Sequence, residues 1–541
     1  MKKLVSVSVF LVLAAACGSE EPTYTTPASG GPPDRGGTVV VGIVSDVQSW
    51  NPYLVEDLES EHVLSLLYPS LAVEQTDYHR HPPSFAPSLA TSWTWSEDHR
   101  VLTLELNPDA RWSDGAPITS RDVVFTWRAQ TSPEVGWLYG YVKDFIETVE
   151  AVDDHTVRAT FSHVYPYQLM DLNDGPIIPA HAWSEIPFDA WGDTDWKGHA
   201  LSGGPFSLSD HTPQQEIVLT RNPSYFRAPL PHLGRVVFRI SPSADGLLTQ
   251  LLAGEIDFLQ SVPPDRLDRV ASRDDLEMVI YDNRSYTHIC WKTDSGPMAD
   301  PAVRNALTTA IDRQKIIDVV YAGFGRIAVG PVLSPFWAFN RELRPLPFDP
   351  GAARAALEAA GWTDSDGDGF VDRNGQTLSI EILAPAENEL RQDIALLVEG
   401  DLEQVGVRVE PRFVEWGTLM AILDAGEADA VVNMWEEPTQ IDLEGLWHSP
   451  APGEPTFNFG RYANPEVDEL LREVAELTNF AEQKPLLDRI QALIVADQPY
   501  TFLVENTRIT VHSALIDGAE INAATPFFNI DEWTVDDAAG R

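Results

Sequence analysis

Positive charge, cysteine and long apolar runs are all scarce in this sequence of 541 residues. Lys and Arg number 37 against 82 Asp and Glu, which gives a formal net charge of −45. This balance excludes a nucleic-acid partner, because a phosphate backbone would be repelled by such a surface. After the first twenty residues no run of 18 or more apolar residues occurs, so the body of the chain is not expected to span a membrane.

Recognisable catalytic motifs are also missing. The sequence contains no G-x-S-x-G or H-E-x-x-H pattern, no glycine loop for phosphate, and no Cys/His set with zinc spacing. We therefore expect the protein not to be an enzyme and to need no catalytic cofactor. Hydrophobic residues make up 43% of the chain and aromatic residues 10%, which is enough for a large packed core. The length predicts several domains.

The N-terminus has the pattern of an export signal. Lys2 and Lys3 precede a short apolar run over 4–16, which predicts a signal peptide over 1–16. The run ends in L-A-A-A-C-G-S, which resembles a bacterial lipobox, and this resemblance implies that Cys17 carries a lipid anchor. An ordinary cleaved signal beside a chance cysteine is the alternative. Residues 17–37 are rich in Pro, Gly, Ser and Thr after the cysteine, which predicts a flexible tether.

The two halves of the chain differ in their predicted secondary structure. Alternating apolar residues in the first half predict strands, with one short helix over 122–130 that Thr119 or Ser120 caps. These strands are expected at 101–106, 148–152, 156–161, 217–220 and 236–240. The second half alternates helices with strands, which predicts parallel strands covered by helices. Its helices are expected at 300–323, 349–361, 389–405, 416–425, 465–477 and 481–496, and its strands at 286–291, 377–383, 407–409, 430–433 and 501–504.

An ordered series of sequence blocks runs along nearly the whole chain. Residues 111–127 read R-W-S-D-G-A-P-I-T-S-R-D-V-V-F-T-W, followed by G-G-P-F at 203–206, R-N-P-S-Y-F at 221–226 and L-L-A-G-E-I-D-F-L at 251–259. The series resembles the family 5 extracellular solute-binding proteins of ATP-binding cassette (ABC) importers, the oligopeptide-, dipeptide- and nickel-binding group. The resemblance implies an α/β fold of the bilobed type II periplasmic-binding-protein kind, with an additional domain inserted in lobe I.

This resemblance also implies where the domains lie. Lobe I would comprise 38–55, 200–285 and 513–541, the inserted domain 56–199, and lobe II 286–512. The chain would cross between the lobes near 283–287 and 510–514, and these two crossings would form the hinge.

The implied function is that of a lipid-anchored extracytoplasmic receptor. It would capture an oligopeptide-like ligand between its lobes and deliver it to an inner-membrane ABC permease. The expected location is the cell envelope, on the periplasmic or outer surface, where the lipid on Cys17 would hold a monomer to the membrane. The same fold binding an oligosaccharide, an opine-like solute or a metal chelate is the alternative.

Candidate ligand-binding residues follow from the same family. In peptide-binding relatives, an amine-binding carboxylate follows a Trp after the strand that residues 431–434 resemble. Here Trp435 is followed by Glu436 and Glu437, but the position of the amine-binding carboxylate is closest to Pro438, so Glu436, Glu437 or Asp442 would have to replace it. An acidic surface loop is the alternative. The resemblance adds the cleft-lining candidates Tyr286, His288 and Trp416, for each of which a structural role is the alternative.

One acidic segment has the spacing of a calcium loop. Asp364, Asp366, Asp368 and Asp372 place carboxylates at alternating positions around a glycine turn. The bidentate Glu expected at the twelfth position is absent, since residue 375 is Gly. A structural calcium site and a polar hairpin therefore both stay open for this segment.

Overall fold

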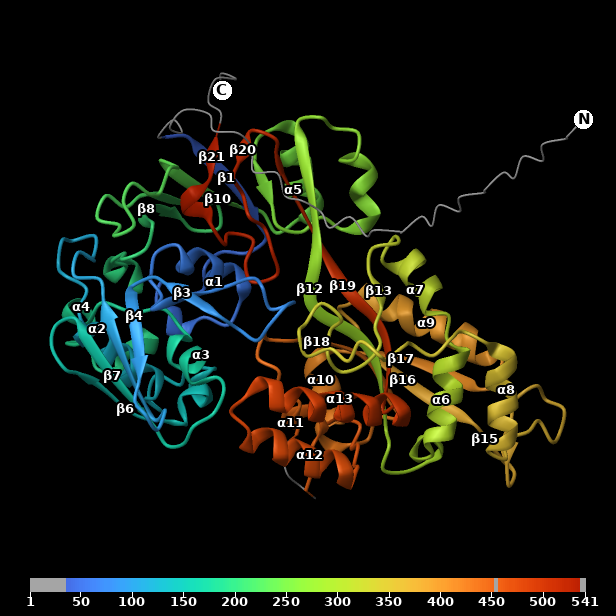
Figure 1. Cartoon of the computed structure of the whole chain (residues 1–541). Coiled ribbons are helices and arrows are strands. Elements are labelled where there is room, and N and C mark those ends of the chain that lie inside the picture. Colours follow the sequence, from blue (N-terminus) through green and yellow to red (C-terminus); the bar gives the residue numbers. More distant parts are fainter. Residues whose placement is uncertain (1–35, 452–455, 536–541) are drawn as a thin grey trace, which may run out of the picture.

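The computed structural model describes residues 36–451 and 456–535. The predicted signal peptide over 1–16, Cys17 and nearly all of the 17–37 tether lie outside the described residues. The chain folds into two lobes joined by a pair of long strands (Figure 1). Within the described part, no helix has the length and apolarity needed to cross a membrane.

A single mixed sheet runs through both lobes in the order β17-β16-β18-β12-β19-β11-β1-β10-β9-β8, with β13 paired to β19. The lobe I strands are β1 (Thr38–Ile43), β8 (Phe206–Thr212), β9 (Glu216–Arg221), β10 (Arg235–Ile240) and β11 (Phe258–Leu259). The lobe II strands are β13 (Arg326–Ile327), β16 (Ser379–Pro385), β17 (Arg408–Val414) and β18 (Ala430–Glu436). In lobe II, β16 runs parallel to β17 and β18, as expected, and β12 pairs antiparallel with β18, so the sheet as a whole is mixed.

The two shared strands, β12 (Leu276–Trp291) and β19 (Tyr500–Ser513), are much longer than the strands expected at 286–291 and 501–504. They pair antiparallel along both lobes, with a register shift between Asp282 and Tyr286. Opposite this shift, Asn506 donates a side-chain hydrogen bond to Ser285 at 2.9 Å. The register shift lies in the region near 283–287, where the first crossing is expected. The second falls earlier than 510–514, because residues 511 and 512 already pair with β11 of lobe I.

The inserted domain carries a separate antiparallel sheet in the order β4-β5-β7-β6. Its elements are α1 (Leu58–Ser65), β2 (Ala72–Glu74), β3 (Phe85–Pro87), β4 (Ala90–Trp95), β5 (Val101–Leu106), α2 (Ser120–Gln130), β6 (Ile146–Ala151), β7 (Thr156–Phe161), α3 (Gln168–Asn173) and α4 (Ala180–Trp183). Helix α2 begins at the expected cap, because Thr119 and Asp122 form a capping box. One hydrophobic core joins this domain to lobe I, so the two pack as a unit.

Lobe II has an apolar core on each face of its sheet. Alternate residues of β12 face opposite cores, with Ile289 on one side and Cys290 on the other. The covering helices are α6 (Pro301–Ala310), α7 (Arg313–Val320), α8 (Pro350–Ala359), α9 (Glu389–Glu403), α10 (Trp416–Ala425), α11 (Glu444–Trp447), α12 (Pro465–Glu476) and α13 (Phe480–Asp497). The single helix expected over 300–323 is wrong. Ile311 leaves the helical conformation, and Asp312 caps a new helix by accepting from the Lys315 amide.

The remaining elements complete lobe I. Helix α5 (Ala244–Ala253) ends at Gly254, whose φ of 73° suits a left-handed C-cap. The short strands β20 (Ile516–Asp517) and β21 (Thr534–Val535) pair with each other. Phe527 and Trp533 of this C-terminal segment are buried in the lobe I core, so the chain returns to lobe I after β19.

Candidate functional site

The candidate site lies at one edge of the lobe II sheet. Strands β16 and β18 run parallel, so their carboxyl ends meet at the same edge. Helix α9 starts just after β16, and α10 starts just after β17. Open α/β sheets bind ligands at such an edge, because the ends of the strands and the beginnings of the helices leave polar groups free there. The predicted residues Trp435 and Glu436 end β18 at this edge.

Trp435 is held in place by a stack of rings. Its indole lies parallel to Phe459, with centroids 5.9 Å apart, and to His288 at 6.3 Å. The indole N–H donates to the Tyr500 hydroxyl at 3.4 Å. The side chain is only partly buried. A fixed and partly exposed indole is suited to contact apolar groups of a ligand.

Tyr286 and His288 lie behind Trp435 and are fully buried in this conformation. The His288 ring stacks flat on Tyr500, with centroids 4.2 Å apart. Burial lowers the pKa of His288 to about 3. Neither ring nitrogen has a hydrogen-bond partner in the described part of the chain. The geometry makes the neutral imidazole a support for Trp435, whereas a direct ligand contact would need the conformation to change.

Glu437 and Asp442 are placed together beside Tyr286. The Glu437 amide donates to the Arg284 carbonyl at 2.6 Å, which fixes the start of the loop that follows β18. Burial and the charge of Asp442 together raise the pKa of Glu437 to about 7, against the opposing effect of the Tyr286 hydroxyl. Both carboxylates line a cavity of about 10 Å³, together with Pro331, Val332, Leu333, Phe336, Ile441 and Leu443. This space is close to the size of one water-sized group.

Two carboxylates of the inserted domain face the same region. Burial raises the pKa of Glu61 on α1, and the charges of Asp174, Asp57 and Glu436 raise it further. Glu436 belongs to lobe II, so its effect on Glu61 places the two carboxylates across the boundary between the lobes. We call Glu436, Glu437, Asp442, Glu61 and Asp174 the acidic side of the site. No Lys or Arg among the described residues forms a salt bridge with any of these five.

Arg391 and Trp416 form a second group at the same edge of the sheet. Trp416 is the first residue of α10 and is 46% exposed. The Arg391 guanidinium, in the first turn of α9, lies 6.0 Å from the centroid of this indole. Burial lowers the pKa of Arg391 below its usual range, and Tyr321 opposes this effect. Over residues 36–451 and 456–535, no carboxylate lies within salt-bridge distance of it. We call this pair the Arg391 side.

The predicted residues therefore divide into two groups. The structure brings Trp435, Glu437, Asp442, Tyr286 and His288 together, with Glu436 turned towards the inserted domain. Trp416 lies with Arg391 instead. Sequence reasoning missed Arg391, Glu61 and Asp174. Nothing in their local sequence separates them from other surface charges, because only the packing of the lobes brings them to the site.

The predicted calcium segment lies away from this edge, in the loop before the hairpin of β14 (Asp372–Arg373) and β15 (Gln376–Thr377). Asp364, Asp366 and Asp368 place ligand oxygens within 4.8 Å of one another. The Asp364 carboxylate already accepts from the amides of Gly367 and Gly369, at 2.7 and 3.1 Å. Asp372 is not part of this group of three, since its carboxylate accepts from Ser365 instead. Calcium binding stays a prediction.

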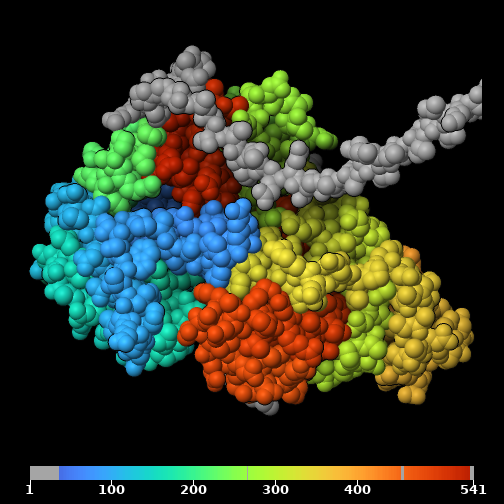
Figure 2. All heavy atoms as spheres, viewed as in Figure 1, coloured from blue at the N-terminus to red at the C-terminus, as the bar shows by residue number. Residues whose placement is uncertain are grey.

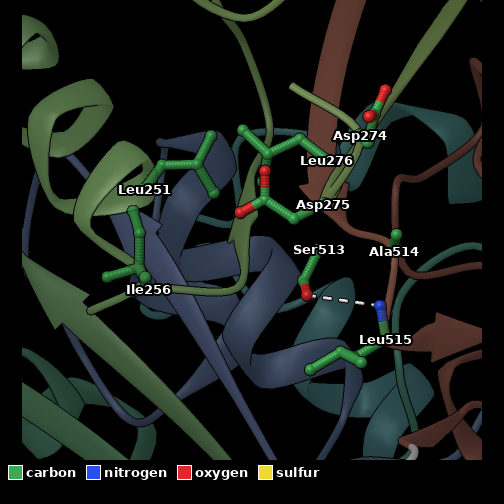
Figure 3. Close-up of a pocket in the computed structure, with 9 residues that line it drawn as sticks. Leu251, Ile256, Asp274, Asp275, Leu276, Ser513, Ala514 and Leu515 are labelled. Atoms are coloured by element: carbon green, nitrogen blue, oxygen red, sulfur yellow. Dashed lines mark hydrogen bonds between the residues drawn. The ribbon is translucent and has the colours of Figure 1, made fainter. Parts of the chain in front are cut away.

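A larger hollow of about 400 Å³ lies in lobe I, away from the candidate site (Figure 3). Its lining is mainly apolar, with Leu251, Ile256 and Leu276 around the space and Asp274 and Asp275 beside them. The Leu515 amide donates to Ser513 at 3.3 Å on one wall. Its residues come from the end of α5 and from the ends of β12 and β19 that lie farthest from the Trp435 edge. We therefore do not include it in the site.

Two lobes, two connecting strands and a site at the edge of the lobe II sheet define a binding protein of the type II periplasmic class. Residues 84–449 match the model of the bacterial extracellular solute-binding proteins, family 5. The chain belongs to this family. Its members are exported receptors for substrates and are not enzymes.

Individual relatives resemble the chain over nearly all of its length. The oligopeptide-binding protein AppA of Bacillus subtilis is 28% identical over 540 residues, which cover 98% of this chain and 98% of AppA. The structure of that AppA with a nonapeptide matches with a TM-score of 0.75 and 26% identity, covering 93% of this chain and 100% of that one. NikA from Brucella suis, in complex with Fe(III)-EDTA, matches with a TM-score of 0.81 and 22% identity over 92% of this chain and 100% of that one, which supports the fold alone.

Proposed function

We propose that this protein is a lipid-anchored receptor that captures an oligopeptide-like ligand between its lobes and delivers it to an ABC permease in the membrane. Cys17 is the proposed anchor, and a monomer is the proposed state. The similarity to an oligopeptide-binding protein over 98% of the chain supports the ligand class. The lipobox-like sequence before Cys17 supports the anchor.

The observation that carries the proposal is the separation of charge within the site. The acidic side has five carboxylates without a salt bridge in the described chain, and the Arg391 side has a half-buried cation without a carboxylate. Leaving a partly buried charge without a partner is costly, and this applies to Glu61, Glu437 and Arg391. The other three carboxylates, Glu436, Asp442 and Asp174, are exposed and add negative charge near the site. A ligand with a positive group at one end and a negative group at the other would satisfy both sides. An unmodified peptide has these groups at its two termini.

The small cavity beside Glu437 and Asp442 sharpens the role of the acidic side. A space of about 10 Å³ suits a primary ammonium, which is about the size of a water molecule. A guanidinium or a quaternary amine is too large for it. We therefore assign Glu437 and Asp442 to the amino group of the ligand. They would replace the amine-binding carboxylate of peptide-binding relatives, whose position is closest to Pro438 in this chain. Glu436, Glu61 and Asp174 add a negative field across the lobe boundary.

The aromatic residues suit a receptor that tolerates different side chains. Trp435 offers a ring face backed by His288 and Phe459, and Trp416 offers an exposed indole beside Arg391. Ring faces bind apolar groups with little demand on their exact shape. The site therefore fixes the charged ends of the ligand and leaves the middle permissive.

Native mass spectrometry of the protein purified from its own cells tests the proposed ligand class. We expect co-purifying solutes of peptide mass, and acid extraction should release free amino termini. Masses of saccharides, opine-like compounds or metal chelates would contradict the proposal and favour the same fold with another ligand. Purification of an Arg391→Gln variant should reduce the peptide signal, while Arg472→Gln, which removes an exposed charge on α12, should leave it unchanged.

A further inference from the structure

Aromatic rings of the inserted domain and of lobe II meet where these two parts of the molecule are in contact. Tyr78 and Tyr167 come from the inserted domain, and Phe336, Trp337 and Phe480 come from lobe II. The Tyr78 ring meets Phe336 edge-on at 5.2 Å, and Trp337 meets Phe480 at 5.4 Å. Phe480 in turn contacts Tyr167 at 5.5 Å. We call these five residues the aromatic clasp.

Hydrogen bonds of backbone and side-chain groups cross the lobe boundary at the same place. The Trp337 amide donates to the Tyr78 carbonyl at 2.9 Å. The Ile441 amide donates to the Tyr167 hydroxyl at 3.0 Å. The Thr439 hydroxyl also donates to the Glu74 carboxylate. In Figure 2, the blue spheres of the inserted domain lie directly against the yellow and orange-red spheres of lobe II. The inserted domain is therefore the part of the first lobe that makes these contacts.

The construction of the clasp allows it to come apart. Tyr78, Tyr167 and Trp337 lie outside helices and strands, and Phe480 is the first residue of α13. Tyr78, Trp337 and Phe480 are only partly buried and pack on the outside of the two cores, whereas Phe336 and Tyr167 are buried members of them. Separation would therefore expose part of the surface of each core. The amides of Trp337 and Ile441 could then bind water instead. The hinge strands, by contrast, pair along both lobes, with register shifts only between Asp282 and Tyr286 and between Thr287 and His288.

We propose that the aromatic clasp is a releasable latch that holds the lobes closed and sets how slowly the ligand leaves. The identity of the ligand in this proposal rests on the proposed function. The latch itself depends only on contacts between the two lobes. A two-state closure responds to every contact that exists in one state alone. Of the clasp rings, only Phe336 borders the cavity assigned to the amino group of the ligand. Contacts made by the other four rings therefore prolong the closed state for every ligand.

Hydrogen exchange of the ligand-free protein tests the latch directly. In Tyr78→Ala and in Tyr167→Ala, the amides of Trp337 and Ile441 should both exchange at least about tenfold faster, because the clasp opens as a unit. Tyr167→Phe keeps the ring against Phe480 and should affect mainly Ile441. Phe145→Ala, which removes an exposed ring of the inserted domain outside the clasp, is the matched control. Small-angle scattering should show a larger radius of gyration for the two alanine variants.

A kinetic measurement completes the test. With a mixture of synthetic nonapeptides as the probe, dissociation should be about tenfold faster in Tyr78→Ala than in the wild type. If each variant changed exchange only at the residue it touches, with no change in scattering, the clasp would be a static interface and the proposal would be overturned. If scattering showed opening but the nonapeptides failed to bind the wild type, the latch would stand while the proposed ligand would fail.

Discussion

Among the described residues, the acidic side of the candidate site lacks positively charged salt-bridge partners, whereas the Arg391 side lacks a negatively charged one. One gathers five carboxylates from both lobes without a salt bridge in the described chain, and the other holds an arginine without a carboxylate. In a protein with 82 acidic residues, pairing that arginine internally would have been easy. Under the proposed function, the ligand supplies the carboxylate for Arg391 and the positive group for the acidic side. For ligand binding, the positions of the carboxylates at the site therefore matter more than the total net charge of −45.

The largest effect is expected at the Arg391 side. Arg391→Gln removes the half-buried cation, and the affinity for a peptide with a free carboxylate should fall about 10- to 100-fold, since hydrogen bonds between charged groups are strong. Isothermal titration calorimetry measures the change. Arg472→Gln is the control, and equal affinities for wild type and Arg391→Gln would remove this side from the site.

A smaller effect with a distinct pH dependence is expected at the acidic side. Because the pKa of Glu437 is about 7, the group is mostly protonated below this pH and negatively charged above it. An ammonium ligand binds the charged form, so its affinity should rise by up to about tenfold between pH 6 and pH 8. Glu437→Gln should lower the affinity at pH 8 and flatten the profile.

The pH dependence of protein stability checks the direction of the pKa shift of Glu437. The folded-state pKa of Glu437 lies above its ordinary value of 4.5, so this group favours the folded state at low pH and loses that contribution as the pH rises through about 7. Glu437→Gln should therefore gain stability relative to the wild type mainly above pH 7. Glu410→Gln, an exposed carboxylate on β17, is the control. A profile for Glu437→Gln identical to that of the control would contradict the assigned pKa.

Variants of Trp435 and Trp416 compare the two sides of the site by the packing of their aromatic rings. Trp435 is backed by His288 and Phe459, so Trp435→Ala should weaken peptide binding about tenfold and also lower the melting temperature. Trp416 is 46% exposed, so Trp416→Ala should weaken binding only about threefold at nearly unchanged stability. Thermal shift with and without peptide distinguishes the two. Unchanged ligand-induced shifts in both variants would remove the aromatic surface from the account.

The smallest effect is expected at the Asp364 turn. Its carboxylates already accept amide hydrogen bonds from Gly367 and Gly369, and residue 375 supplies no twelfth ligand. Millimolar calcium should therefore shift the melting temperature by less than about 1 °C. A larger rise that Asp366→Asn abolishes would establish the structural calcium site that the spacing suggests.

The sequence predicted the acidic side better than the Arg391 side, for a physical reason. Trp435 and Glu436 end strand β18 and Glu437 follows it, so predicting the strand already places them at the edge of the sheet. Arg391 reaches the same edge through the packing of α9 beside β16, and Glu61 reaches it through the packing of the inserted domain against lobe II. Such placements depend on tertiary contacts that local periodicity does not contain.

The fold shows the same division. Helices with their own capping residues, such as α8 after Asp349 and α10 up to Gly426, were predicted to within two residues. The break between α6 and α7 was missed, because Ile311 continues the apolar stripe while leaving the helix to be buried in the core. The lengths of β12 and β19 were missed because half of each strand lies in the other lobe, beyond the point where each strand was expected to begin or end.

One measurement tests the central claim most directly. The affinities of a single peptide with a free and with an amidated C-terminus are compared by calorimetry in the wild type and in Arg391→Gln. The account predicts that amidation weakens binding to the wild type by about tenfold or more and has almost no effect on the variant, because the lost partner is the same. An equal loss on amidation in both proteins would show that Arg391 does not bind the carboxylate and would contradict the account.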